Sequence, residues 1–278
     1  VIVPRLNSYF VANVLAGMED AANREGYNLI ISQSQENAAK EVANAHTMFN
    51  KGVDGLLISL AYNTEEIDHL KPFFRKHIPV IFFDRVYPGN EYTSVIIDNF
   101  KAAYDVTKHL LDQGCRRIMH LGGNLLRNVY AERLRGYKQA LKDHKIPFEE
   151  KLVYISTLTE DAGREAGELI LSLKLKDRPD AVFSANDTAA VFCMSTLKAA
   201  GIRVPEDVAF AGFNNDPISK VVEPSLTTVN YPGYHIGEAA VSSLINLIRG
   251  VTSSKNMNTI ILRSDLLIRD SSSKNKSL

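Results

Sequence analysis

Short apolar runs alternate with amphipathic stretches along nearly the whole chain, and this alternation constrains the fold more than any other feature of the sequence. The runs are continuous, as in strands that are buried on both faces of a parallel sheet. They lie at 1–3, 29–31, 55–58, 79–83, 94–97, 117–121, 152–155, 181–183 and 208–211. Between them, apolar residues recur three and four positions apart, for example Phe10, Val14 and Met18, which predicts helices packed on the sheets. The pattern therefore predicts an α/β fold with doubly wound parallel sheets.

The count of strand–helix units indicates two lobes, because charge, Gly and Pro content show no linker-like break. Five units fill residues 1 to about 98, and about four more fill residues 99 to 225. A helical pattern at 235–249 and an apolar run at 259–268 follow. The length of 278 residues suits two packed domains. The polar residues 271–278 are expected to form a flexible tail.

Composition excludes several classes of protein. The 32 basic residues balance the 32 acidic ones, so the chain alone has no net field to hold DNA or an anionic membrane. No apolar run approaches the ~18 residues of a membrane span. Two distant cysteines, Cys115 and Cys193, favour a reducing cytoplasm over a disulfide framework or a redox pair. Val1 already reads as strand, so either an export signal or an N-terminal domain is expected to precede it.

The residue patterns of common enzymes are missing from the sequence. It contains no G-x-S-x-G elbow, no phosphate-binding P-loop, no G-x-G-x-x-G fingerprint and no H-E-x-x-H pair. The seven histidines are scattered, with none three or four residues from another, which argues against a metal site. We therefore expect no catalysis, no cofactor and no metal.

Polar side chains gather where the apolar runs end, at the edge where open α/β sheets bind ligands. The candidates from the first half are Arg5, Asn7, Tyr9, Phe10, Ser59, Asp84 and Arg85, and those from the second half are Asn186, Asp187 and Asn214. Carboxylates and amides bind vicinal hydroxyls and aromatic rings stack on sugars or bases, so a hydroxyl-bearing ligand is indicated. Helix capping explains Asp98, Asn99 and Asp187 equally well. Arg133, within a helical stretch, could instead pair with a surface acid, and Phe10 could belong to the core.

Several motifs occur in an order that resembles the lactose-repressor/galactose-repressor family of bacterial transcription regulators. The most specific is the run 201–208, Gly-Ile-Arg-Val-Pro-Glu-Asp-Val, which is followed by Gly212-Phe213 and by Pro-Ser-Leu-Thr-Thr-Val at 224–229. The others are Val-Ile-Val-Pro at 1–4, Val-Asp-Gly-Leu at 53–56, Phe-Asp-Arg at 83–85, Ile-Asp-Asn at 97–99, Arg133 three before Gly136-Tyr137, Ala-Asn-Asp at 185–187 and the ending at 263–271. The resemblance covers essentially the whole chain.

The resemblance implies a fold like that of type I periplasmic binding proteins, with two lobes joined by three crossovers and an effector in the cleft. The N-lobe would comprise 1–98 and 232–260, and the C-lobe 99–231 and 261–270. By motif position, effector contacts would come from Tyr9, Phe10, Ser59, Asp84, Arg133, Leu158, Asn186 and Asn214. Three positions depart from the family pattern: Arg5 and Asn214 replace usual acids, and Leu158 replaces a frequent stacking aromatic, which favours a sugar or sugar derivative over a flat purine.

The expected function is that of a ligand-responsive regulator, which binds a small-molecule effector and, through an N-terminal helix-turn-helix head missing from this chain, operator DNA. It would act as a homodimer in the cytoplasm, with the Ile67, Phe73 and Phe74 region as one candidate interface and a core role as the alternative. The need for a co-repressor protein stays open. The alternative function is that of a periplasmic sugar-binding protein for transport or chemotaxis, which would have the same fold.

Overall fold

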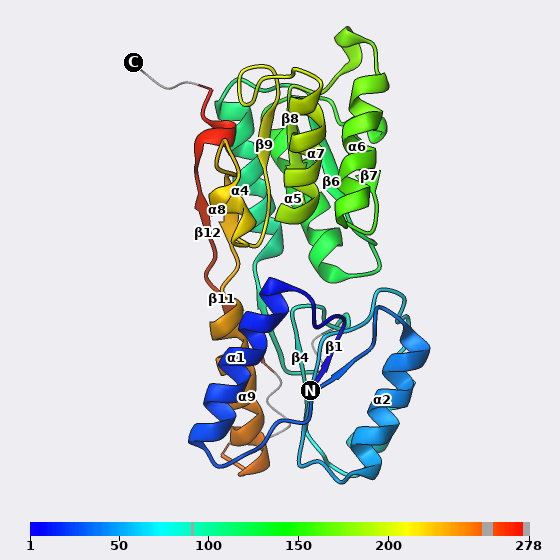
Figure 1. Cartoon of the computed structure of the whole chain (residues 1–278). Helices are drawn as coiled ribbons and strands as arrows, with labels where there is room; N and C mark the ends of the chain where they lie inside the picture. The colour runs from blue at the N-terminus through cyan, green and yellow to red at the C-terminus, as the bar shows by residue number, and fades with distance from the viewer. Residues whose placement is uncertain (90–91, 252–257, 275–278) are drawn as a thin grey trace. The chain divides into compact units, whose positions relative to one another are not determined.

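The computed structural model describes residues 1–89, 92–251 and 258–274, which form two compact units. Unit 1 comprises Val1–Ile97, Leu126–Asn128 and Pro232–Arg263, and unit 2 comprises Asp98–Leu125, Val129–Tyr231 and Ser264–Leu278. Each unit has its own mainly parallel sheet covered by helices, so the predicted α/β class is confirmed (Figure 1). The last passage between units follows Arg263 rather than residue 260, and residues 126–128 join unit 1 although they were expected in the C-lobe.

Unit 1 is built on a six-stranded parallel sheet in the order β11-β5-β4-β3-β1-β2. Its strands are β1 (Ile2–Val3), β2 (Ser32–Gln33), β3 (Leu56–Ile58), β4 (Val80–Phe83), β5 (Ser94–Ile97) and β11 (Thr259–Leu262). Its helices are α1 (Tyr9–Arg24), α2 (Ala38–Asn50), η1 (Asp68–Leu70), α3 (Lys71–Arg75) and α9 (Gly233–Ile248). Strands β1, β3 and β4 are wholly buried, as their continuous apolar runs predict.

Helices α1 and α9 lie side by side on one flank of this sheet (Figure 1). Gly17 of α1 and Gly237 of α9 allow the close approach: a Cβ atom on Gly17 would lie 2.0 Å from the Tyr234 carbonyl oxygen, and one on Gly237 would lie 2.0 Å from that of Val14. Glycine removes the side chains that would hold the two backbones apart.

A core cluster in unit 1 contains two of the residues considered for a dimer interface. Ile67 and Phe73 are buried among Leu56, Ile58 and Phe82, while Phe74 packs against the cluster from its edge. Placing a subunit interface at Ile67 and Phe73 is therefore wrong, because their side chains are already enclosed by their own unit.

Unit 2 has a four-stranded parallel sheet, in the order β7-β6-β8-β9, and a separate antiparallel pair of β10 and β12. The strands are β6 (Ile118–Gly122), β7 (Val153–Ile155), β8 (Ala181–Ser184), β9 (Ala209–Ala211), β10 (Thr228–Asn230) and β12 (Asp265–Leu267). The helices are α4 (Asn99–Asp112), α5 (Asn128–Asp143), η2 (Glu150–Leu152), α6 (Glu160–Ser172), η3 (Leu175–Asp177), α7 (Asp187–Ala199), α8 (Ile218–Val221) and η4 (Asp270–Ser272).

The sequence prediction misplaced three strands. The run 29–31 is not a strand; β2 is the polar pair Ser32–Gln33 that follows it, and Ile30 and Ile31 are exposed. The run 259–268 is two strands, β11 in unit 1 and β12 in unit 2. The prediction missed β10, which pairs with β12, because the polar residues Thr228 and Asn230 leave no apolar run in its sequence.

The predicted flexible tail is wrong for the residues that the structure describes. Ser271 and Ser272 are completely buried in η4. The Ser271 hydroxyl donates to the Phe210 carbonyl at 2.7 Å and accepts from the Thr227 amide at 2.9 Å. Hydrogen bonds therefore anchor this polar segment to β9; residues 275–278, the rest of the expected tail, lie outside the described residues.

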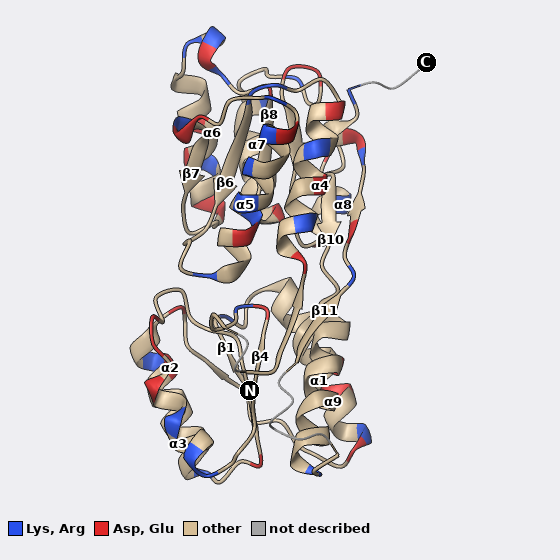
Figure 2. Ribbon diagram, turned by 180° about the vertical axis from the view of Figure 1, so that it is seen from behind, with Lys and Arg blue, Asp and Glu red and all other residues tan. Residues whose placement is uncertain are grey.

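Acidic and basic residues are interspersed on the helices of both units, as the balanced composition predicts (Figure 2). Ion pairs join many of them along one helix, for example Lys101 with Asp105 and Lys108 with Asp112 in α4. None of the helices that the structure describes is long and apolar enough to cross a membrane.

Candidate functional site

In unit 1, the carboxyl ends of neighbouring parallel strands bring three polar residues to one edge of the sheet. Two of them, Ser59 and Asp84, were predicted from the sequence, and Ser34 was not. Ser34 follows β2, Ser59 follows β3 and Asp84 follows β4, and the order β4-β3-β1-β2 places these strands together. The hydroxyls of Ser34 and Ser59 are buried and have no hydrogen-bond partner among the described residues. Asp84 is nearly buried and has a left-handed backbone, with φ of 58°. Buried, unsatisfied hydroxyls and a strained backbone are typical of a binding site.

Two of the predicted cations at this edge share one carboxylate. Arg85 donates from Nη1 to Glu36 Oε2 at 2.7 Å, and Arg5 Nε lies 3.4 Å from Glu36 Oε1. The Arg85 guanidinium also lies 5.3 Å from the centroid of the Tyr62 ring. The structure therefore brings Arg5 and Arg85 together through Glu36, which the sequence analysis missed.

The short segment Leu126–Asn128 also belongs to this edge and was missed. The Asn128 side chain donates to the Asp84 carbonyl at 3.1 Å and accepts from the Val86 amide at 3.0 Å, which ties the segment to the end of β4. Beside it, Arg127 is 3% exposed, and its guanidinium donates from Nη2 to the Thr64 carbonyl. Its Nε and Nη1 groups have no partner among the described residues. Burial and the nearby charge of Arg85 lower the pKa of Arg127.

The remaining predicted residues of unit 1 lie at the start of α1. Phe10 is buried and Tyr9 is half exposed, so the aromatic pair divides between core and surface. Asn7 is exposed. Ser8 caps the helix by accepting from the Val11 amide, and Asn7 therefore precedes the cap in the loop after β1.

Arg133 is a buried predicted residue of unit 2. Its Nε donates to Asn99 Oδ1 at 2.9 Å and its Nη1 donates to the Ala185 carbonyl at 2.7 Å. The guanidinium lies over the Phe213 ring, 3.6 Å from the centroid, and within 6 Å of Tyr130 and Tyr231. The alternative that Arg133 only pairs with a surface acid is wrong, because its side chain is buried among aromatic rings.

Asn186 and Leu158 are joined by a hydrogen bond. Asn186 caps α7, since its Oδ1 accepts from the Ala189 amide at 2.9 Å, and its Nδ2 donates to the Leu158 carbonyl at 2.8 Å. Leu158 is buried and has a left-handed backbone, with φ of 56°. The structure therefore brings these two predicted contacts together at the carboxyl end of β8.

Asp187 belongs to a buried network behind Asn186 and is not a helix cap. Its carboxylate accepts from the Thr228 hydroxyl at 2.6 Å and from the Asp216 amide at 2.7 Å. Burial raises the pKa of Asp187 to about 7 and that of Asp216 to about 6. Asn214, two residues before Asp216, forms an isolated parallel β-bridge with Asn230 of β10 and has φ of 116°.

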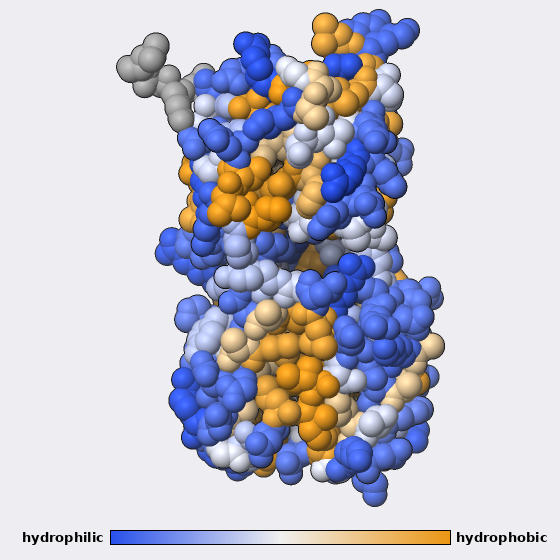
Figure 3. Space-filling view, in the orientation of Figure 1, coloured by the Kyte–Doolittle hydropathy of each residue, from blue (hydrophilic) through white to orange (hydrophobic). Residues whose placement is uncertain are grey.

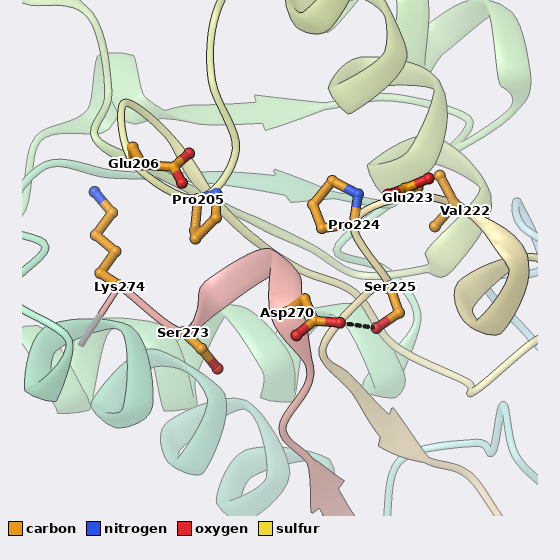
Figure 4. Close-up of a pocket in the computed structure, with 9 residues that line it drawn as sticks. All are labelled: Pro205, Glu206, Val222, Glu223, Pro224, Ser225, Asp270, Ser273 and Lys274. Atoms are coloured by element: carbon orange, nitrogen blue, oxygen red, sulfur yellow. Dashed lines mark hydrogen bonds between the residues drawn. The ribbon is translucent and has the colours of Figure 1, made fainter. Parts of the chain in front are cut away.

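Two hollows contain none of the predicted site residues. In unit 1 an apolar groove of about 220 Å³ runs between α2 and α9 at the amino ends of β1 and β3, where hydrophobic surface gathers (Figure 3). In unit 2 a hollow of about 560 Å³ is lined by Pro205, Glu206, Val222, Glu223, Pro224, Ser225, Asp270, Ser273 and Lys274 (Figure 4). Residues 205–206 precede β9, so this hollow lies at the strand edge opposite to Asn214.

Comparison with known proteins shows which proteins this chain is similar to. A family model described as a periplasmic binding protein-like domain matches residues 107–272. Catabolite control protein A of Priestia megaterium is 33% identical over 245 residues, which are 88% of this chain and 73% of that protein. The chain belongs to the LacI family of transcriptional regulators. It is the periplasmic-binding-protein-like, effector-binding domain of such a regulator, as the resemblance in the sequence indicated.

Further LacI-family proteins match over similar lengths. The repressor PurR of Vibrio atlanticus is 30% identical over 92% of this chain and 76% of its own. Among solved structures, the regulator CcpA of Lactococcus lactis has a TM-score of 0.88 at 28% identity, over 98% of this chain and 97% of that chain. A complex of the regulator CelR with cellobiose has a TM-score of 0.87 at 27% identity, over 97% of this chain and 83% of that chain. LacI-family regulators are not enzymes; they bind small effectors and DNA as dimers.

Proposed function

We propose that the effector of this LacI-family domain is a sugar or a sugar derivative. The buried Ser34 and Ser59 hydroxyls, with Asp84 at the end of the next strand, carry this proposal. Hydroxyls and a carboxylate at one sheet edge can donate to and accept from the vicinal hydroxyls of a sugar. Leaving the Ser34 and Ser59 hydroxyls buried without partners among the described residues costs free energy, which a ligand with several hydroxyls would recover.

The character of Leu158 supports a sugar over a purine. A flat base gains affinity by stacking on an aromatic ring, and a leucine at this position offers none. Two relatives have names that agree with this choice: the ribose operon repressor of Haemophilus influenzae and the CelR–cellobiose complex. The name of PurR points to the other class, so purines belong in the test.

We assign the effector contacts to two sets of side chains, one in each unit. The principal contacts are Tyr9, Phe10, Ser59 and Asp84 in unit 1 and Arg133, Leu158, Asn186 and Asn214 in unit 2, with Arg5, Asn7, Arg85 and Asp187 as further contacts. An effector that binds one conformation of the domain more tightly than another shifts the protein toward that conformation. That preference is the coupling free energy, typically about 1–3 kcal/mol, that would reach a DNA-binding helix-turn-helix head. The assembly would be a cytoplasmic homodimer.

A thermal-shift screen tests the proposal directly. We expect one class among pentoses, hexoses, disaccharides, uronates and sugar phosphates to raise the Tm by several degrees, since a ligand at ~100 times its Kd adds about 2.7 kcal/mol to the folded state. Asp84→Asn and Arg133→Met should remove the shift, and Arg135→Met, an exposed neighbour on α5, should retain it. A shift by purines alone would contradict a sugar effector.

A further inference from the structure

Arg127 has more hydrogen-bonding capacity than its surroundings in unit 1 use. The guanidinium has five N–H donors, and its contact with the Thr64 carbonyl engages Nη2 alone. Nε and Nη1 are buried and have no acceptor among the described residues. An unpaired buried cation is strongly unfavourable, so a native guanidinium in this state is expected to have a partner that is not part of the protein.

No carboxylate within the described residues forms an ion pair with Arg127. Glu36 is shared by Arg5 and Arg85 and also accepts from the Tyr62 amide. Glu41 is buried and accepts from the Ala61 amide at 2.6 Å and the Thr64 hydroxyl at 3.0 Å. Both acids therefore satisfy other donors, and neither accepts from the Nε or Nη1 group of Arg127.

The position of Arg127 places this charge at the ligand-binding edge of the sheet. Its neighbour Asn128 is hydrogen-bonded to the backbone at 84 and 86, and Thr64 lies in the loop that begins with Ser59. The two buried hydroxyls of Ser34 and Ser59 lie at the same edge. Neutral hydroxyls and an unpaired guanidinium are thus available together.

We propose that the effector is an acidic sugar derivative whose oxyanion, a carboxylate or a phosphate, binds the Nε and Nη1 groups of Arg127. A guanidinium matches the geometry of either oxyanion and forms charge-assisted hydrogen bonds that are stronger than those to a neutral hydroxyl. This inference rests on the proposed function and narrows the class of effector. The buried hydroxyls then bind the sugar part of the same molecule.

The test uses matched neutral and acidic probes in calorimetric titrations and thermal shifts of the whole chain. The probes are D-glucose, D-glucose 6-phosphate and D-glucuronate; D-galactose and D-galacturonate; D-ribose and D-ribose 5-phosphate; and inorganic phosphate alone. We expect at least one acidic sugar to bind about tenfold or more tighter than its neutral parent, a difference of about 1.4 kcal/mol. The phosphate and uronate arms distinguish the two oxyanions.

Variants of Arg127 then assign the binding to this residue. Arg127→Gln should weaken binding of the acidic sugar about tenfold or more, and Arg127→Lys, which keeps the charge but loses the fork, should weaken it less. Arg24→Gln is the matched control, because Arg24 is exposed and pairs with Glu238. Circular dichroism verifies that each variant is folded.

Three results would overturn the inference. Binding of the neutral parents as tight as that of the acidic sugars would do so and would leave the proposed sugar effector intact. An acidic sugar whose affinity is the same for Arg127→Gln and the wild type would show that the oxyanion binds elsewhere. If no probe of either kind bound, both the inference and the proposed function would fail.

Discussion

The guanidinium of Arg133 lies 3.6 Å from the centroid of the Phe213 ring, while the same group donates to Asn99 and to the Ala185 carbonyl. These contacts orient the side chain from three directions before any ligand is bound. A preorganised arginine loses little conformational freedom on binding, which adds to affinity. They also give Arg133 a structural role in unit 2 that can be separated from its proposed role in binding.

Replacing Arg133 should therefore affect both stability and binding. Arg133→Met leaves the Ala185 carbonyl without a partner, and the free energy of unfolding in urea should fall by about 1–3 kcal/mol. Arg133→Lys keeps the positive charge but lacks the planar guanidinium with its several N–H donors, so it should retain only part of the stability that Arg133→Met loses. For the control, Arg135→Met, we expect a change within about 0.5 kcal/mol, because Arg135 is exposed. Equal stability of the Arg133→Met variant and the wild type would contradict the role of these hydrogen bonds.

The raised pKa of Asp187 predicts that stability depends on pH with an unusual sign for a carboxylate. Burial raises this pKa to about 7 from 3.8, against smaller lowering effects of Thr228 and Arg269. The folded state then retains a proton on Asp187 that the unfolded state has released. The stability that Asp187 contributes is therefore complete below about pH 4 and is lost as the pH rises through 7. The free energy of unfolding should fall over this window by at most about 1.4 kcal/mol per pH unit.

Asp187→Asn should flatten this pH dependence, because an amide can mimic the protonated acid: it can accept from the Asp216 amide and donate to the Thr228 hydroxyl. Urea titrations between pH 4.5 and pH 7.5 measure the slope in each variant. Asp54→Asn, at an exposed position, serves as the control and should keep the wild-type slope. If the slopes of Asp187→Asn and the wild type coincided, the carboxyl of Asp187 would not be the source; Asp216, whose pKa burial also raises, would then be tested next.

The sequence predicted the fold class and much of the site because both depend on local patterns. Continuous apolar runs indicate β3, β4, β6 and β8. Ser59 and Asp84 directly follow two of these runs, and Asn186 follows a third within three residues. The sequence analysis did not identify Arg127, because nothing in the neighbouring sequence indicates that this residue is buried. Its partner, the Thr64 carbonyl, is 63 residues away, and only the fold brings the two together. The sequence analysis did not identify Ser34, because the predicted strand, 29–31, ends two residues before β2 does.

The C-terminal serines illustrate the same limit. The polar side chains of Ser271 and Ser272 suggest a solvated tail, yet their hydroxyls form hydrogen bonds with groups on β9, on α4 and on Thr227, which precedes β10. A hydrogen bond between distant segments leaves no periodic signal in the sequence, unlike an apolar stripe. Polar composition alone therefore does not distinguish a frayed end from an end held by buried hydroxyls.

A substitution at Ser271 tests how strongly this end is held. Ser271→Ala removes the partner of the Phe210 carbonyl and of the Thr227 amide, both of which are buried. The free energy of unfolding should fall by about 1–3 kcal/mol, the usual penalty for a buried polar group that loses its partner. Ser242→Ala, at an exposed position of α9, should change it by less than about 0.5 kcal/mol. A flexible tail would give the same small change for both variants.

The contact between α1 and α9 makes the strongest prediction about packing. Gly17→Ala would place a methyl group 2.0 Å from the Tyr234 carbonyl oxygen, and Gly237→Ala would place one 2.0 Å from that of Val14. Since the obstructing atoms belong to the backbone, the helices must separate, and overpacking of this kind costs about 1–3 kcal/mol. Alanine is intrinsically the better helix former by about 1 kcal/mol, so a net loss of stability would come from the contact itself.

Thermal and urea unfolding of the two single variants and the double variant separate these effects. Each single variant should lower the Tm, and the double variant should lose less than the sum, because helices already moved apart by one methyl group accommodate the second. Glu19→Ala, on the exposed face of α1, is the control and should change stability by less than about 0.5 kcal/mol. If Gly17→Ala and Gly237→Ala both stabilised the protein, helix propensity would outweigh the close approach, and the two glycines would not be required by the packing of α1 on α9.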